Sequence, residues 1–146
     1  MEKIFTIQDA NLLVPRIAGI FDEINELDKK LKSINSDIEN LLSIWGNELL
    51  DKDHLDNSEY ELKVDEKKKI AREIHDKVEE IHATGAVVKD ISKGLVDFYY
   101  SYGGEIVLLC WKTGENQIQF WHSMENGFQN RRPISEIEKI PTPRAE

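Results

Sequence analysis

An uninterrupted heptad pattern of apolar residues runs through the first third of the chain. From residue 17 to residue 45, large apolar side chains recur at alternating spacings of three and four. Such spacing places them on one face of a helix and is typical of a coiled coil. The pattern therefore predicts a long helix over residues 15–45. Its apolar positions are Ile17, Ile20, Ile24, Leu27, Leu31, Ile34, Ile38, Leu41 and Trp45.

Pro15 and Gly46 mark the predicted ends of this helix. Proline suits a first helical position, and glycine commonly follows the last turn. A short helix over residues 7–14 is predicted before Pro15, with Thr6 and Asp9 at the spacing of a capping box. After a polar, acidic connection, a second long helix is predicted over residues 59–93. The two long helices would form an antiparallel hairpin.

Strand-like patterns follow at residues 95–99, 105–112 and 117–121, separated by glycine-containing turns. They predict a three-stranded antiparallel meander, so the fold class is α+β. Residues 1–133 form a single predicted domain and residues 134–146 a loosely held tail. Pairing residue 112 with residue 117 would place His122 on the apolar face that packs on the helices. The same register sends four side chains to the opposite face: Asp97, Cys110, Gln119 and Trp121.

The net charge of −9 is concentrated in the predicted hairpin. Residues 22–84 hold 18 acidic and 10 basic side chains, an excess that repels phosphate and argues against nucleic-acid binding. No apolar run is long enough to cross a membrane, and Met1 is not followed by the pattern of a secretory signal. A single cysteine, Cys110, excludes an internal disulfide. These features predict a cytoplasmic protein.

His122 is the main candidate for chemistry, as a metal ligand or a general base. A divalent metal is the expected cofactor, with His54, Glu48 and Asp53 as its companions; the polar loop that contains His54 lacks the ligand spacing of an EF-hand. Asp97 is a further carboxylate considered near His122, although the predicted strand register separates the two. A histidine satisfied by a structural carboxylate or a backbone carbonyl is the alternative interpretation.

Three other sets of residues are less favoured as functional sites. Arg131 and Arg132 would suit an anion, but internal ion pairs explain them equally well. Cys110 lies within a predicted strand, which favours a packed, inert thiol. His75, Glu79 and His82 share one helical face, where solvated side chains are the usual explanation. No nucleotide-binding, dehydrogenase, esterase or zincin motif is present.

Several short blocks of the chain resemble the prokaryotic domain-of-unknown-function family numbered 2203. The similarity covers roughly residues 5–134, with Tyr99 where proline is expected and Asn130 where glycine is expected. The resemblance supports the fold boundaries and the location and implies no activity, ligand or site residue. Its blocks are Phe5-Thr6, Ala10-Asn11, Leu13–Arg16, Trp45-Gly46, Gly94–Phe98, Cys110-Trp111, Gly114-Glu115, Trp121-His122, Gly127-Phe128 and Arg132-Pro133.

Two alternative functions follow, and the first, in which no enzymatic activity is evident, is preferred. The first is a binding or assembly module that forms a homodimer through the long helices, with an unidentified small-molecule ligand or partner. The second is a metal-dependent hydrolase or other small metal enzyme. Its site would lie where His122, the 51–54 loop, Glu115 and Arg132 converge.

Overall fold

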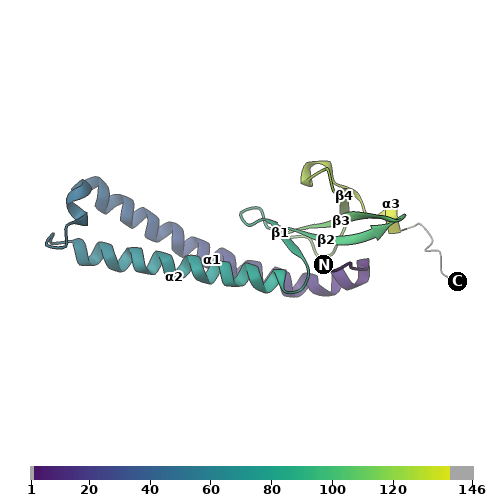
Figure 1. Cartoon of the computed structure of the whole chain (residues 1–146), viewed down its shortest axis with the longest axis horizontal. Helices are drawn as coiled ribbons and strands as arrows, with labels where there is room; N and C mark the ends of the chain where they lie inside the picture. The colour runs from purple at the N-terminus through teal and green to yellow at the C-terminus, as the bar shows by residue number, and fades with distance from the viewer. Residues whose placement is uncertain (1, 139–146) are drawn as a thin grey trace. The chain divides into compact units, whose positions relative to one another are not determined.

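Residues 2–138 are described by the structure, a computed structural model, and they form an α+β fold (Figure 1). The described chain divides into two compact units, residues 2–21 with 79–138 and residues 22–78. The prediction of one domain over residues 1–133 stays a prediction. The elements, in order, are α1 (Ile7–Trp45), η1 (Gly46–Leu50), α2 (Asn57–His82), β1 (Val87–Asp90), β2 (Leu95–Tyr102), β3 (Glu105–Lys112), β4 (Phe120–Ser123), η2 (Phe128–Asn130), β5 (Arg132–Pro133) and α3 (Ser135–Glu138).

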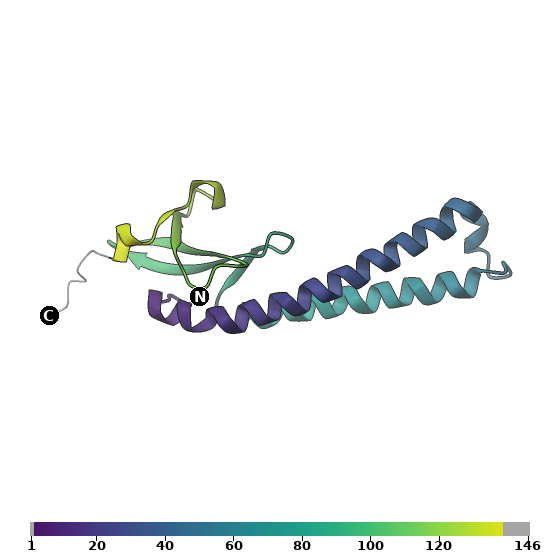
Figure 2. The ribbon, with the colours of Figure 1, turned by 180° about the vertical axis from the view of Figure 1, so that it is seen from behind.

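The second unit is a helical hairpin in which α1 and α2 run side by side, as Figures 1 and 2 both show. The heptad positions Ile34 and Ile38 of α1 are buried with Ile70 of α2, so the apolar seam faces the partner helix. Six half-buried residues surround this cluster: Leu27, Leu31, Leu42, Tyr60, Val64 and Ile74. The predicted hairpin is thus present, and its heptad seam is covered within the chain.

Helix α1 begins at Ile7 and continues through Pro15, so the predicted break into two helices was wrong. Proline costs one main-chain hydrogen bond but its fixed φ is compatible with a helix. Val14 and Ile17, on either side of Pro15, are buried, and this packing holds the helix together where proline weakens it. The predicted cap is present, since the Asp9 amide donates to the Thr6 hydroxyl at 2.9 Å.

Helix α2 ends at His82 and not at residue 93, as the sequence pattern suggested. Gly85 follows with φ of +101°, a backbone conformation that ends a helix and that side-chain-bearing residues avoid. The Thr84 hydroxyl also bonds the Ile81 carbonyl at 2.6 Å, so that helical carbonyl is satisfied locally. The apolar positions beyond it belong to a strand, β1, because β-branched valines pack well in a sheet.

The sheet has five antiparallel strands in the order β1-β2-β3-β4-β5, two more than predicted. The predicted bounds of β3 are confirmed, whereas β2 extends to Tyr102 and β4 lies at Phe120–Ser123. Val96 pairs with Trp111 and Phe98 pairs with Leu109, so these four share one face, as expected. This face packs on the first part of α1 through Phe21 and Trp111, whose ring centroids lie 6.1 Å apart.

The pairing of β3 with β4 differs from the predicted register by one residue. Leu108 lies opposite His122, and Leu109 lies opposite Trp121. A shift of one residue moves every side chain of a strand to the other face, so the predicted faces of His122 and Trp121 were both wrong. The connection is longer than a tight turn because the Ile118 amide donates to the Asn11 side chain of α1 at 2.6 Å.

The end of the described chain is more ordered than predicted. Ser135–Glu138 forms the short helix α3, in which Ile137 is buried. The rest of the predicted tail, residues 139–146, lies outside the described residues. Among residues 2–138, no helix combines the length and the apolar character needed to span a bilayer.

Candidate functional site

Three polar side chains project from neighbouring strands onto the same buried face of the sheet. Asp97 on β2 is paired directly with Cys110 on β3, and His122 on β4 pairs with Leu108, two residues before Cys110. This is the face opposite to the one that packs on α1, because side chains alternate along a strand. The prediction that Cys110 and Asp97 point away from His122 was therefore wrong.

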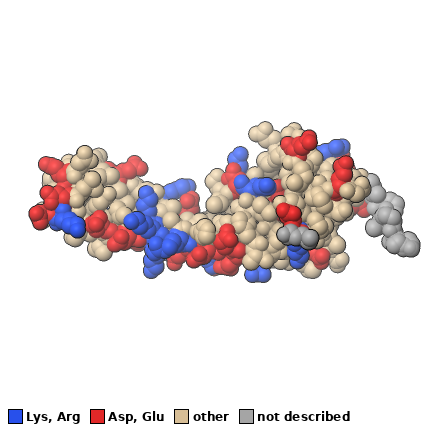
Figure 3. Space-filling view, viewed as in Figure 1, with Lys and Arg blue, Asp and Glu red and all other residues tan. Residues whose placement is uncertain are grey.

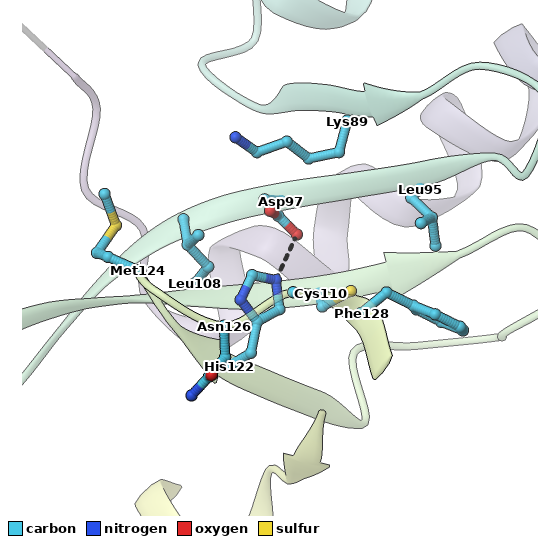
Figure 4. Close-up of a pocket in the computed structure, with 10 residues that line it drawn as sticks. Lys89, Leu95, Asp97, Leu108, Cys110, His122, Met124, Asn126 and Phe128 are labelled. Atoms are coloured by element: carbon cyan, nitrogen blue, oxygen red, sulfur yellow. Dashed lines mark hydrogen bonds and ion pairs between the residues drawn. The ribbon is translucent and has the colours of Figure 1, made fainter. Parts of the chain in front are cut away.

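The three side chains are buried and close together (Figure 4). Their exposed fractions are 2% for Asp97, 1% for Cys110 and 4% for His122. One ligand atom from each, a carboxylate oxygen, a sulfur and a ring nitrogen, lie within 4.8 Å of one another. Among residues 2–138, no other group of three or more histidine, cysteine and carboxylate side chains comes close enough together to hold a metal ion.

Both ring nitrogens of His122 have defined neighbours. Nδ1 lies 2.9 Å from the Ser123 carbonyl oxygen, which can only accept, so Nδ1 carries a proton. Nε2 lies 3.3 Å from Oδ1 of Asp97. Burial lowers the pKa of His122, but hydrogen bonds to Asp97, Cys110 and the Ser123 carbonyl, with the Asp97 charge, raise that pKa from 6.5 to about 10. Without a metal, the ring is therefore an imidazolium paired with a buried carboxylate.

A cavity of about 220 Å³ lies over this cluster. Its floor is the sheet, its rim includes Lys89 of β1, and the segment from Met124 to Phe128 closes it on one side (Figure 4). Its walls are mainly apolar, since Leu95, Leu108 and Phe128 line it. A small, largely apolar cavity with a few convergent polar groups is typical of a ligand site.

The positions of the ring nitrogens favour metal binding over a thiol relay. In a relay, one histidine nitrogen takes the nucleophile's proton while the other is held by the carboxylate. Here Asp97 contacts Nε2, and the opposite nitrogen, Nδ1, donates to a carbonyl and not to the thiol, so the relay arrangement is not present. A metal at Nε2 would instead use the ring as Ser123 already orients it, with Asp97 and Cys110 as further ligands.

The two predicted anion-binding arginines both form internal ion pairs. Arg131 donates to Glu115 at 2.9 Å and is stacked between Phe120 and Phe128, with guanidinium-to-centroid distances of 4.1 and 4.3 Å. Arg132 pairs with Glu136 at 2.8 Å. Neither arginine lines the cavity, but Arg131 supports Phe128, which does. Anion binding by this pair stays a prediction.

The other predicted metal ligands, His54, Glu48 and Asp53, belong to the helical unit, whereas His122 belongs to the sheet unit. The His54 ring accepts the Asp56 amide at 3.0 Å and packs edge-on against Trp45. Glu48 and Asp53 are exposed. A metal site formed by these three residues with His122 stays a prediction.

The exposed histidines of α2 have local partners. His82 lies 3.0 Å from Glu79, and its other nitrogen accepts the Val88 amide at 3.2 Å. His75 lies 3.8 Å from Asp76. These contacts agree with the interpretation of that helical face as a solvated one.

Sequence reasoning selected His122 but did not place Asp97 and Cys110 beside it, because it misplaced one strand by a single residue. The sequence did contain a signal that groups these three residues. Three of the blocks that carry the family resemblance, Gly94–Phe98, Cys110-Trp111 and Trp121-His122, each supply one member of the cluster.

Comparison with known proteins gives a family but no function. No curated protein and no solved structure matches the chain. Residues 3–134 match the family model described as "Uncharacterized conserved protein (DUF2203)". The chain therefore belongs to the DUF2203 family.

Proposed function

We propose that this protein binds a divalent transition metal, with zinc as the first candidate, through Asp97, Cys110 and His122. One observation carries the proposal: an oxygen, a sulfur and a nitrogen ligand atom converge within 4.8 Å on a buried sheet face. Imidazole, thiolate and carboxylate are the ligands that zinc prefers in proteins, whereas magnesium and calcium prefer oxygen alone. The set predicted around His54 is the alternative, and it is tested below.

The charges of the cluster favour such an ion. A thiolate and a carboxylate together neutralise a divalent cation, which is needed where all three side chains are at least nine-tenths buried. The Ser123 carbonyl holds the proton on Nδ1 and leaves Nε2 for the metal. A hydrogen bond of this kind commonly orients metal-binding histidines and fixes their tautomer.

Three protein ligands leave a fourth position of a tetrahedral ion open, as in catalytic zinc sites. The cavity beside Cys110 and His122 gives a small molecule access to that position. A bound metal would supply a Lewis acid and lower the pKa of a bound water, the chemistry of hydrolysis. The apolar walls, Leu95, Leu108 and Phe128, would keep bulk water away from the reacting group. We therefore propose metal-dependent hydrolysis as the reaction class.

Equilibrium dialysis against Zn²⁺, followed by elemental analysis, tests the site. We expect one zinc per chain, and its loss in the variants Asp97→Asn, Cys110→Ser and His122→Gln. Circular dichroism would check that each variant is folded. Zinc at 100 times its dissociation constant should also stabilise the wild-type fold by about 2.7 kcal/mol, a shift that needs no variant.

Two control variants make this test specific. His82→Gln removes a histidine that also contacts a carboxylate but lies on an exposed helical face, so zinc content should not change. His54→Gln tests the other predicted ligand set. Retained zinc in that variant is expected, whereas its loss would contradict a site made by Asp97, Cys110 and His122.

A free thiol in the site suits a reducing compartment, and we propose the cytoplasm as the location of the protein.

Self-association is a second candidate function, supported by a specific feature of the helical unit. Four large apolar side chains are exposed where α1 passes through η1 into α2. Figure 3 shows uncharged and acidic surface, with a smaller basic area, on the visible face of this tip. Because the heptad seam is covered by α2, we propose that two copies associate through the tip. Its residues, with their exposed fractions, are Ile44 (68%), Leu50 (53%), Leu55 (87%) and Leu62 (69%).

Sedimentation equilibrium tests this second candidate. The wild-type protein should form dimers, and the double variant Leu55→Glu, Leu62→Glu should be monomeric with unchanged helix content. Leu12→Glu is the matched control, because Leu12 is 73% exposed on α1 but lies in the other unit. A wild-type protein that stays monomeric at millimolar concentration would contradict the proposal.

A further inference from the structure

Lys89 is an uncompensated positive charge at the rim of the cavity. It is exposed, and among residues 2–138 no side chain forms an ion pair or hydrogen bond with its ammonium group. The register between β1 and β2 shifts between Val88 and Asp90, so Lys89 is the extra residue of a β-bulge. Bulges redirect side chains, and in Figure 4 the Lys89 side chain lies between β1 and β2, above Asp97.

The electrostatic balance of the cavity makes this lysine significant. In the metal-loaded state, the Asp97 and Cys110 charges would be neutralised by the ion. The remaining polar side chain of the lining, Asn126, is neutral and already donates to the Ser123 hydroxyl at 2.9 Å. The one remaining charge in the lining is then the Lys89 ammonium. A cavity with low-dielectric walls and one positive charge attracts anions.

The size and walls of the cavity restrict the anion. Its 220 Å³ is about seven times the ~30 Å³ that a water molecule occupies in the liquid. That space suits a small organic molecule rather than a peptide or a nucleotide. Leu95, Leu108, Met124 and Phe128 line the cavity, so the part of the ligand away from its charge should be apolar.

We infer that the cavity binds a small organic carboxylate, with its charged end on Lys89 and its apolar part against Leu95, Leu108 and Phe128. This inference rests on the proposed metal site, which would define the position of the ligand's reactive group. It names the substrate class, small carboxylic acids and their derivatives, and assigns Lys89 as the residue that selects them by charge.

Isothermal titration of the zinc-loaded protein with 3-methylbutanoate tests this assignment, with the neutral isostere 3-methylbutanamide as the reference ligand. Lys89→Met should weaken carboxylate binding at least about fivefold, since a hydrogen bond to a charged group is lost. Amide binding should not change. Lys89→Arg keeps the charge and should restore most of the affinity. Lys93→Met is the matched control, because Lys93 follows β1 closely but does not line the cavity.

Zinc content, measured in the same samples, separates the two proposals. If the wild-type protein binds no zinc, the proposed function fails and this inference fails with it. If zinc binds equally to wild type and Lys89→Met, the metal site stands. Equal carboxylate affinity in those two proteins, or binding of the amide as tightly as the carboxylate to wild type, would then overturn the assignment of Lys89 alone.

Discussion

Asp97 and His122 lie on strands that do not pair with each other, yet Oδ1 of the first is 3.3 Å from Nε2 of the second. Cys110 lies on the strand between them. Two ionisable groups are thus enclosed on a sheet face where a buried charge is costly unless it is paired. The stability of the metal-free protein should therefore depend on this pair.

Replacing Asp97 by Asn should destabilise the metal-free protein. The variant leaves His122 buried without its carboxylate, and removing one partner of a buried ion pair typically costs about 3–5 kcal/mol. Loss of a proton from the ring would relieve part of this cost. Urea denaturation at pH 7 measures the change, and NMR titration of the ring should show a lower His122 pKa. A change below about 0.5 kcal/mol would be that of an ordinary surface substitution and would contradict the pairing.

The stability of the metal-free protein should fall as the pH rises from 7 to 10. The pKa of His122 is raised to about 10 in the folded chain, against 6.5 when unfolded, so the folded state binds the proton more tightly. The contribution of His122 to the free energy of unfolding is fully present below pH 6.5 and is lost as the pH rises through 10. Denaturation at several pH values in the presence of a chelator measures this free energy. Lysines and tyrosines titrate near the same pH, so the comparison is with His122→Gln, whose stability should depend less on pH.

Arg131 and Arg132 should differ in their contribution to stability although they are adjacent. Arg131 and its partner Glu115 have side chains only 14% and 16% exposed, and Arg131 also stacks on Phe120 and Phe128. Arg131→Ala should cost about 2 kcal/mol or more. Arg132 pairs with Glu136 at 60% and 38% exposure, where ion pairs contribute about 0–1 kcal/mol. Equal losses in thermal denaturation of Arg131→Ala and Arg132→Ala would contradict this account.

Gly94 should tolerate alanine less well than Gly103. Both have positive φ, of +67° and +60°, so the backbone strain of an added side chain is similar. A Cβ at Gly94 would collide with the Thr113 side chain, whereas a Cβ at Gly103 meets nothing within 4 Å. The Gly94 carbonyl also accepts the Thr113 amide at 2.9 Å. Denaturation midpoints of Gly94→Ala and Gly103→Ala should therefore differ, with the first lower.

Sequence patterns correctly predicted the helices and strands that are determined by neighbouring residues in the chain. The heptad spacing from Ile17 to Trp45 identified the hairpin, and the bounds of β3 were correct because alternation and the flanking turns define them. The end of α2 was missed since Val88 and Ile91 continue the helical spacing beyond Gly85, where the helix ends. Packing around Pro15 likewise overrode the helix break that proline predicts.

The grouping of Asp97 and Cys110 with His122 was not predicted, because it depends on a contact that no local pattern reveals. The register of β4 depends on the bond between the Ile118 amide and Asn11, which joins residues 107 positions apart. Without it, a tighter connection and a register shifted by one residue are equally reasonable. The shift decides whether His122 meets Asp97 or the apolar core.

The absorption spectrum of the cobalt-substituted protein tests the central claim most directly. One equivalent of Co²⁺ added to the metal-free wild-type protein should give an intense near-ultraviolet band from charge transfer between a thiolate and the metal. Cys110 is the single cysteine of the chain, so the band can come from no other side chain of the protein. We expect the band in the wild type and in His54→Gln, and its absence in Cys110→Ser. A folded wild-type protein that shows no such band with Co²⁺ would contradict a metal centre at Asp97, Cys110 and His122.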